Sequence, residues 1–260
     1  MLRHLRSNRN AAALVRGIFN FYGDTVHFTE DASLPKSDYQ LDYDSDPPVW
    51  RQAVVRLQLG TAHVRESLAH ELLHLDTFRR RFPTYRGIEA NEGLKPYKDD
   101  LIRLVTELRN LVDHEIIQSD FLALGYSEKL FARFAPPAVD YEKEAKKVEA
   151  SGPNPVNFSV WCLEYSKNWN TSRLCGYPQA AEWAESVRHW GSRVHPDLPA
   201  VIAGMHQWLE KGEFRDPTTF IAAFGDLLQL MRLPRVVGWF ALEARLAKPP
   251  VIWLLDESEG

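Results

Sequence analysis

The sequence predicts an α+β fold that is predominantly helical, and three observations predict it. Long segments carry apolar residues at spacings of three and four, the periodicity of amphipathic helices. Two short segments alternate apolar and polar residues, as strands do when one face is buried. The 260 residues are 45% hydrophobic and 25% charged, a composition that excludes a disordered chain and supports a sizeable core.

The N-terminal part is expected to combine a small sheet with long helices. In chain order the expected elements are a helix (8–22), a strand (25–29), an exposed loop (31–49), a second strand (51–59) and two long helices (63–82 and 97–120). Pro83 ends the first long helix because proline cannot continue the helical hydrogen bonding. The polar, glycine-containing connection between the long helices is typical of a loop.

The C-terminal part is expected to be a separate helical domain. Pro136, Pro137 and the mixed-charge run that follows mark the boundary. We therefore predict a metal-binding domain (1–135), a linker (136–156) and a helical domain (157–260). Helices are expected at 157–174, 178–191, 197–211 and 216–232. The tail from 234 to 255 fits a helix or a hairpin.

Charge, hydropathy and cysteine content exclude several classes of function. A net charge of −4 and a pI near 6.2 argue against a general nucleic-acid binder, because no excess positive charge exists to neutralise phosphates. No apolar run approaches the ~20 residues that span a bilayer. Cys162 and Cys175 form no CxxC pair, which favours a reducing compartment. We expect a cytoplasmic protein without a membrane or nucleic-acid partner, and its oligomeric state stays open.

One motif carries chemistry: His70-Glu71-Leu72-Leu73-His74, within the first long helix. Histidines four residues apart lie one turn apart on the same helical face, so both can bind one metal ion. Glu71 is displaced by about 100° around the helix axis and can reach a metal-bound water without being a ligand. This combination predicts a zinc site with Glu71 as the general base. The alternative is a surface-facing histidine pair, with Glu71 in a solvated ion pair.

A catalytic zinc ion needs a third protein ligand, and the motif does not supply one. The second long helix carries His114, forty residues after His74 and beside its buried stripe, and we predict this histidine as the third ligand. Glu115, Asp113 and Glu89 are the alternatives, in that order. Two tyrosines between the helices are candidates for stabilising an oxyanion, although a structural role is the commoner explanation: Tyr85 and Tyr97.

The order of strand, His-Glu-x-x-His helix and second helix resembles the ImmA/IrrE-like zinc peptidases and the gluzincins generally. The resemblance covers residues 8–125 and rests on the motif, with a softer likeness at 110–114. It implies a zincin-like N-terminal part, a single Zn²⁺ ion, a water nucleophile and a peptide or protein substrate. The chain would then be a zinc metallopeptidase, a hydrolase. Gluzincins use an acidic third ligand, whereas His114 is a histidine. The alternative function is a noncatalytic regulatory or partner-binding protein on the same scaffold.

Overall fold

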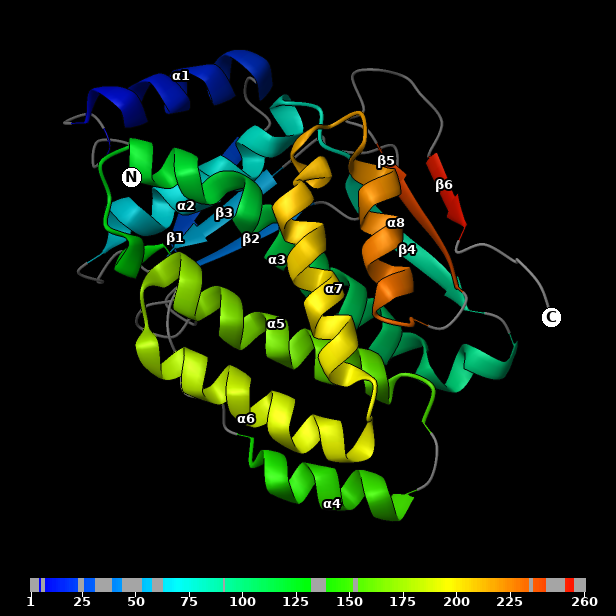
Figure 1. The fold of residues 1–260 in the computed structure, drawn as a ribbon. Helices are drawn as coiled ribbons and strands as arrows, with labels where there is room; N and C mark the ends of the chain where they lie inside the picture. Colours follow the sequence, from blue (N-terminus) through cyan, green and yellow to red (C-terminus); the bar gives the residue numbers. More distant parts are fainter. Residues whose placement is uncertain are drawn as a thin grey trace. The chain divides into compact units, whose positions relative to one another are not determined.

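The structure is a computed structural model of the 260-residue chain (Figure 1). It describes the backbone of residues 5, 8–22, 26–30, 39–43, 53–57, 63–90, 92–131, 139–151, 154–233, 236–241 and 251–254. The α-helices are α1 (Arg9–Tyr22), α2 (Val64–Arg79), α3 (Lys98–Ala123), α4 (Tyr141–Ser151), α5 (Asn157–Cys175), α6 (Pro178–Val194), α7 (Leu198–Lys211) and α8 (Phe220–Leu230). The 3-10 turns are η3 (Glu92–Tyr97), η4 (Glu128–Leu130) and η5 (Glu213–Arg215). The strands are β1 (Val26–Glu30), β2 (Tyr39–Tyr43), β3 (Ala53–Leu57), β4 (Thr84–Ala90), β5 (Val236–Ala241) and β6 (Val251–Leu254).

The chain divides into two compact units, each built from separate stretches of sequence. The first comprises residues 1–84, 113–133 and 242–249, and the second comprises 85–112, 134–241 and 250–260. The division falls within α3, whose last part therefore belongs to the first unit. The role of residues 136–156 as a linker stays a prediction.

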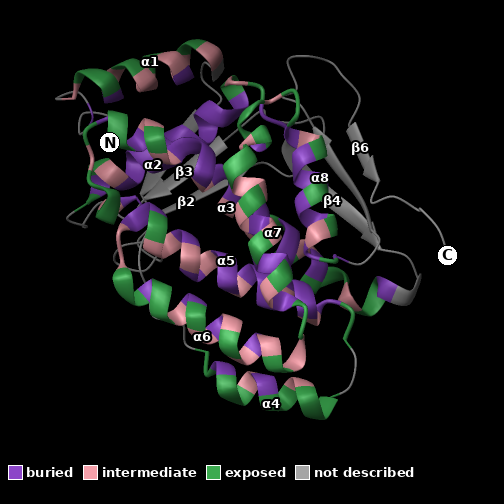
Figure 2. Ribbon diagram, viewed as in Figure 1, coloured by how far each residue is buried: buried purple, intermediate pink, exposed green. Residues whose placement is uncertain are grey.

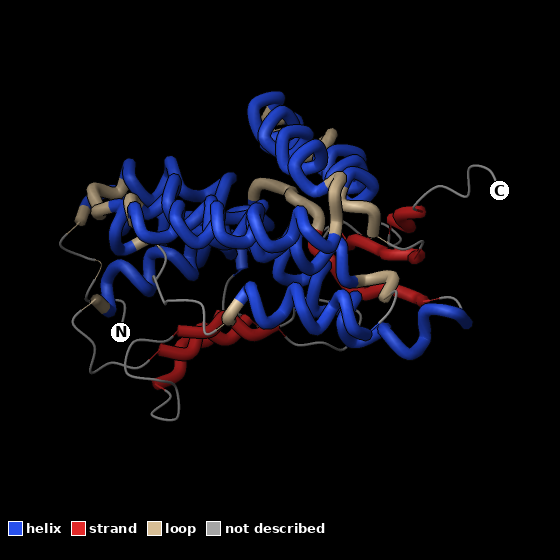
Figure 3. The backbone as a smooth tube through the Cα atoms, turned by 60° about the horizontal axis from the view of Figure 1, so that its bottom comes forward, coloured by secondary structure: helices blue, strands red, loops and turns tan. Residues whose placement is uncertain are grey.

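The predicted α+β class is wrong for the part of the chain that is described with its side chains. Of those residues, 82% are helical and none lies in a strand, so this part is all-α. Only the backbone of the strands, drawn in red in Figure 3, is described. The short alternating segments suggested a sheet that would share in the core. The described core consists instead of side chains from helices and the turns between them, because the long apolar stripes supply it.

The strands pair in two three-stranded arrangements of the backbone. In the first, β3 lies between β1 and β2, with β1 parallel to it (Val26 opposite Ala53) and β2 antiparallel (Tyr39 opposite Leu57). In the second, β5 lies between β4 and β6. The tail that fitted a helix or a hairpin contains β5 and β6, which pair antiparallel with Val237 opposite Leu254.

The helices expected from apolar periodicity are confirmed as α1, α2, α3, α5, α6, α7 and α8, with ends that differ by a few residues. The connection expected to be a loop contains β4 and η3. The charged run after Pro137 forms α4, which carries i,i+3 and i,i+4 ion pairs on its exposed side. No helix in the described residues is long and apolar enough to cross a membrane.

In the first unit, α2 is enclosed along most of its length. Every residue from Ser67 to Phe78 is buried, and Figure 2 shows this helix largely in purple. It packs against α1 and lies along the backbone of β2 and β3. Its C-terminal end is fixed by an ion pair between Arg80 and Asp120 of α3, at 2.6 Å. From Ser67 to Phe78 the helix is therefore buried on all sides.

In the second unit, α5 and α6 lie side by side at close range (Figure 1). Gly191 of α6 allows this approach, because a Cβ atom there would lie 2.8 Å from the Trp161 ring and 2.5 Å from the Leu198 side chain. The core of the unit is rich in fully buried rings, among them Phe214, Phe220 and Phe224. The aromatic residues that recur at helical spacing in this unit therefore serve to pack its core.

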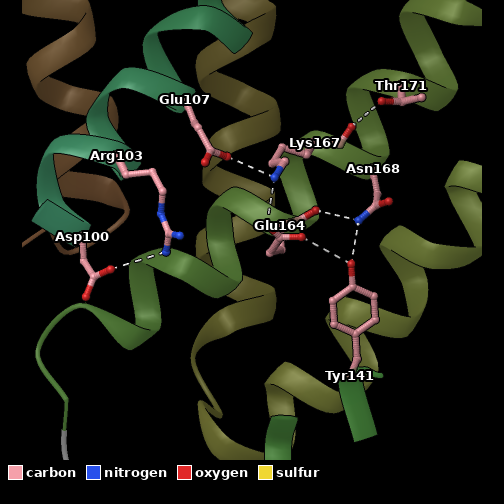
Figure 4. A network of polar contacts seen from close by, with 8 residues as sticks. All are labelled: Asp100, Arg103, Glu107, Tyr141, Glu164, Lys167, Asn168 and Thr171. Carbon is pink, nitrogen blue, oxygen red and sulfur yellow. Dashed lines mark hydrogen bonds and ion pairs between the residues drawn. The ribbon is translucent and has the colours of Figure 1, made fainter. Parts of the chain in front are cut away.

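A polar network joins α3, α4 and α5 within the second unit (Figure 4). Lys167 lies 3.0 Å from both Glu107 and Glu164, and Asn168 donates to the Tyr141 hydroxyl at 3.1 Å. The Tyr141 hydroxyl also lies 3.4 Å from Glu164. Glu107 of α3 is thus engaged in an ion pair with Lys167 of α5.

Candidate metal centre

The first two residues of the site come from consecutive turns of α2. His70 and His74 are separated by one helical turn, and their ring centroids lie 4.8 Å apart. Their Nε2 atoms lie only 3.1 Å apart. Thr77 donates its hydroxyl hydrogen to the carbonyl oxygen of His74 at 2.7 Å, within the last turns of the helix. Helix α2 therefore directs the imidazoles of His70 and His74 toward a common point.

The third residue comes from α3, forty residues further along the chain. The His114 ring lies 5.0 Å from the His70 ring and 5.4 Å from the His74 ring, measured between centroids. One nitrogen from each of the three histidines falls within 4.8 Å of the others. Two helices of the first unit thus bring together the three residues that the sequence predicted as ligands.

The site is secluded from solvent, and this seclusion sets its electrostatics. His70 and His74 are 3% and 9% exposed, while His114 is half-buried. Burial lowers the pKa of His70 well below its usual value, and the neighbouring His74 and His114 lower it further, against a hydrogen bond with the Phe131 backbone. Burial also lowers the pKa of His114 to about 4. Both imidazoles are therefore neutral at pH 7.

Glu71 lies between the two motif histidines in sequence and is 5% exposed. Burial raises the pKa of its carboxyl to about 8, because an isolated carboxylate is poorly solvated inside the protein. On the helix it is turned about 100° from His70. The surface-pair alternative, with Glu71 in a solvated ion pair, is excluded by this burial.

The donor set fits a transition-metal ion. Metal ions bind neutral imidazole, and the lowered pKa values of His70 and His114 keep their lone pairs available at pH 7. Imidazole nitrogen suits zinc, copper, iron and nickel. Two nitrogens bound to one tetrahedral zinc ion stand about 3.3 Å apart, close to the 3.1 Å between His70 and His74. Three histidines leave the fourth zinc position open.

Two phenyl rings form one wall of the cluster. The Phe131 ring lies 5.0 Å from His70 and 5.3 Å from His114, and the Phe121 ring lies 6.3 Å from His70. Both phenylalanines are completely buried. No pattern in the sequence pointed to Phe131, since it lies outside the predicted helices and far along the chain from the motif.

The other candidates whose side chains the structure describes lie outside the histidine group. Asp113 and Glu115 are buried beside His114 in α3, but neither belongs to the metal-ligating group found among the described residues. Tyr97 lies in η3 and belongs to the second unit. The remaining two lie in β4, outside the residues whose side chains are described: Tyr85 and Glu89.

No protein-family model, curated protein or solved structure matches the chain. The resemblance to ImmA/IrrE-like peptidases therefore stays a prediction, and function has to be argued from the site itself.

Proposed function

We propose that the chain is a zinc-dependent hydrolase, with a peptide or protein as its substrate. The observation that supports this most is the convergence of three imidazoles from two helices, one of which also carries the buried carboxyl group of Glu71. Three histidine ligands with an open fourth position are a catalytic zinc arrangement, whereas structural zinc sites use four protein ligands. The proposed ligands are His70, His74 and His114.

Each of the four site residues has a distinct task in this proposal. The histidines hold the ion through nitrogen atoms from two helices, so the geometry depends on the packing of α2 against α3. A bound zinc ion supplies a Lewis acid that lowers the pKa of a water to about 7 and polarises a carbonyl. The Glu71 carboxylate takes a proton from the attacking water and delivers it to the leaving amine.

The protonation state of Glu71 is consistent with this task. Its raised pKa of about 8 belongs to the metal-free site, where no positive charge opposes desolvation. A dication within a few ångströms favours the ionised carboxylate and lowers that pKa. Glu71 is then available as a base near neutral pH.

A second candidate function is favoured by the burial of the site. Motif residues that are 3–9% exposed are also what a structural metal site in a noncatalytic, partner-binding protein would have. In that protein the ion would stabilise the packing of α2 against α3, and Glu71 would have no chemical task. The two functions therefore differ at Glu71.

The experiment that separates them is a Glu71→Gln variant loaded with zinc. Glutamine has nearly the same shape but cannot accept the proton. The hydrolase proposal expects one zinc ion per chain in both proteins. It also expects hydrolysis of a fluorogenic peptide library by the wild type, and a loss of about a hundredfold or more in the variant. Equal activities of the two proteins would contradict it. Hydrolysis only of non-peptide amides would support the hydrolase proposal and contradict the proposed peptide or protein substrate.

A further inference from the structure

Residues Leu124–Phe131 form a connected turn that returns the chain from the end of α3 to the histidine cluster. Gly125 adopts a φ of +87°, a left-handed conformation that favours glycine, and its N–H donates to the Leu122 carbonyl at 2.8 Å. Backbone bonds from Leu130 to Ser127 and from Phe131 to Glu128, both 2.9 Å, close the 3-10 turn η4. We call residues 124–131 the strap.

The last residue of the strap lies directly on the cluster. The Phe131 ring lies against both His70 and His114. An apolar shell around a metal site limits the access of solvent and ligands. Phe131 is completely buried and its ring closes one wall of the cluster, whereas His114 is partly exposed.

The first residue of the strap is anchored to the N-terminus of α1. The Asn8 side-chain amide donates to the Leu124 carbonyl at 2.5 Å. The Asn8 Oδ1 atom accepts from the backbone N–H groups of Asn10 and Ala11, at 3.0 and 3.1 Å, and so caps α1. Asn10 adds a bond to the Ala123 carbonyl at 3.1 Å. The strap is therefore held at one end by α1 and at the other by the cluster.

We propose that the strap is a cover that controls how fast metal ions and small ligands enter and leave the histidine cluster, with Phe131 as the covering side chain. This rests on the metal binding in the proposed function. A cover obstructs both directions of exchange. Removing its ring therefore raises the association and dissociation rate constants by similar factors and leaves the dissociation constant nearly unchanged. Loss of a ligand or of general packing acts differently, because it weakens the affinity through dissociation alone.

The test compares Phe131→Leu with Phe214→Leu, since both rings are completely buried and Phe214 belongs to the second unit. Leucine keeps most of the apolar volume, so both variants are expected to fold. Cobalt(II) binding is followed by its visible absorption in a stopped-flow instrument, and release is followed with an excess of chelator. We expect Phe131→Leu to raise both rate constants about tenfold, and Phe214→Leu to change them less than about twofold.

Asn8→Ala provides a second variant that leaves the ring in place and loosens the other end of the strap. It is expected to raise both rate constants in the same direction, by a smaller factor. Unchanged rates in Phe131→Leu, or faster dissociation with unchanged association, would overturn the cover. Faster metal exchange in Phe131→Leu, together with no hydrolysis of any substrate by the wild type, would support the cover proposal and contradict the hydrolase proposal. A wild-type protein that binds no cobalt or zinc would overturn both.

Discussion

The Nε2 atoms of His70 and His74 lie 3.1 Å apart inside the protein, where both imidazoles are almost completely buried. At this distance either one Nε2–H donates a hydrogen bond to the other Nε2 or a cation lies between the two nitrogens, because two facing lone pairs repel. A helix alone does not impose this proximity, since i,i+4 side chains can diverge. The enclosure of α2 holds the two rings together, and His114 approaches them from α3.

Metal content should depend on histidines from both helices. We expect one zinc ion per chain in the wild type, measured by elemental analysis after gel filtration. His70→Ala and His114→Ala should each weaken binding by about a hundredfold or more, because each removes a ligand. His189→Ala, at an exposed position of α6, is the control and should retain the ion. Zinc lost with His70 but kept with His114 would move the third ligand to Glu115, Asp113 or Glu89.

Glu71→Gln should stabilise the metal-free protein at alkaline pH. The folded-state pKa of Glu71 is about 8, above the usual 4.5, so the folded state holds its proton more tightly than the unfolded state. The stability that this provides is present below about pH 4.5 and is lost as the pH rises to about 8. Glutamine does not titrate, so the variant should be more stable at pH 8 by a few kcal/mol.

Urea unfolding of metal-free protein at pH 5 and pH 8 measures this effect. The advantage of Glu71→Gln should shrink at pH 5, where both proteins are neutral at this position. Glu66→Gln, five residues earlier in α2 at a less buried position, is the matched control for replacing a carboxyl group on this helix. A variant that is equally stable with the wild type at pH 8 would show that Glu71 is solvated.

Acid should destabilise the metal-free protein through the histidines. Burial lowers the folded-state pKa values of His70 and of His114, the latter to about 4, so the unfolded state binds protons more readily. Stability is then complete above about pH 6.5 and is lost as the pH falls towards 4. His114 alone contributes up to about 3 kcal/mol.

The Glu71→Gln background isolates this effect, since Glu71 titrates in the opposite sense over an overlapping range. In that background, unfolding free energies should fall between pH 7 and pH 5. Adding His114→Gln should flatten the curve, and His189→Gln should leave it unchanged. A curve with the same slope after His114→Gln would assign the acid sensitivity to other groups, such as His195, whose pKa burial also lowers.

Helical periodicity in the sequence was enough to place the long helices. Motif spacing selected His70 and His74, and the position of His114 beside the stripe of the second long helix selected this third residue, which lies against the other two. Periodicity and motif spacing can be read from one segment of the sequence, because they depend on a single helix. The fold class was predicted wrongly because short alternating segments such as 51–59 look the same whether or not their side chains share a core. The alternation of apolar and polar residues is a property of one segment, whereas the composition of the core depends on which segments pack against one another.

The environment of the site could not be predicted for a related reason. The apolar stripe through Leu68 and Leu72 suggested an amphipathic helix with solvent behind it, yet His70, Glu71 and Thr77 on its other sides are buried too. Their burial depends on α1 and on the chain beyond α3. Phe131 in particular reaches the cluster through a turn at Gly125, and a single phenylalanine outside a helix carries no pattern.

The thiols of the second unit should be inert in the folded protein. Cys162 is completely buried, and burial raises the pKa of its thiol to about 12, so almost no thiolate exists at pH 8. Cys175 is 1% exposed. Ellman's reagent should label neither cysteine of the native protein within minutes and both in urea. Fast labelling of Cys162 in the native protein would show that α5 opens locally.

Asn8→Ala should destabilise the first unit through two losses at once. The Asn8 side chain caps α1 through the backbone of Ala11 and also holds the Leu124 carbonyl at the end of α3. Losing a helix cap costs about 1–2 kcal/mol, and the second bond places the expected value at the upper end of this range. Asn10→Ala removes one exposed bond and should cost less than about 0.5 kcal/mol. Urea unfolding of the two variants measures the difference, and equal losses would mean that neither the cap nor the Asn8 bond to Leu124 contributes measurably.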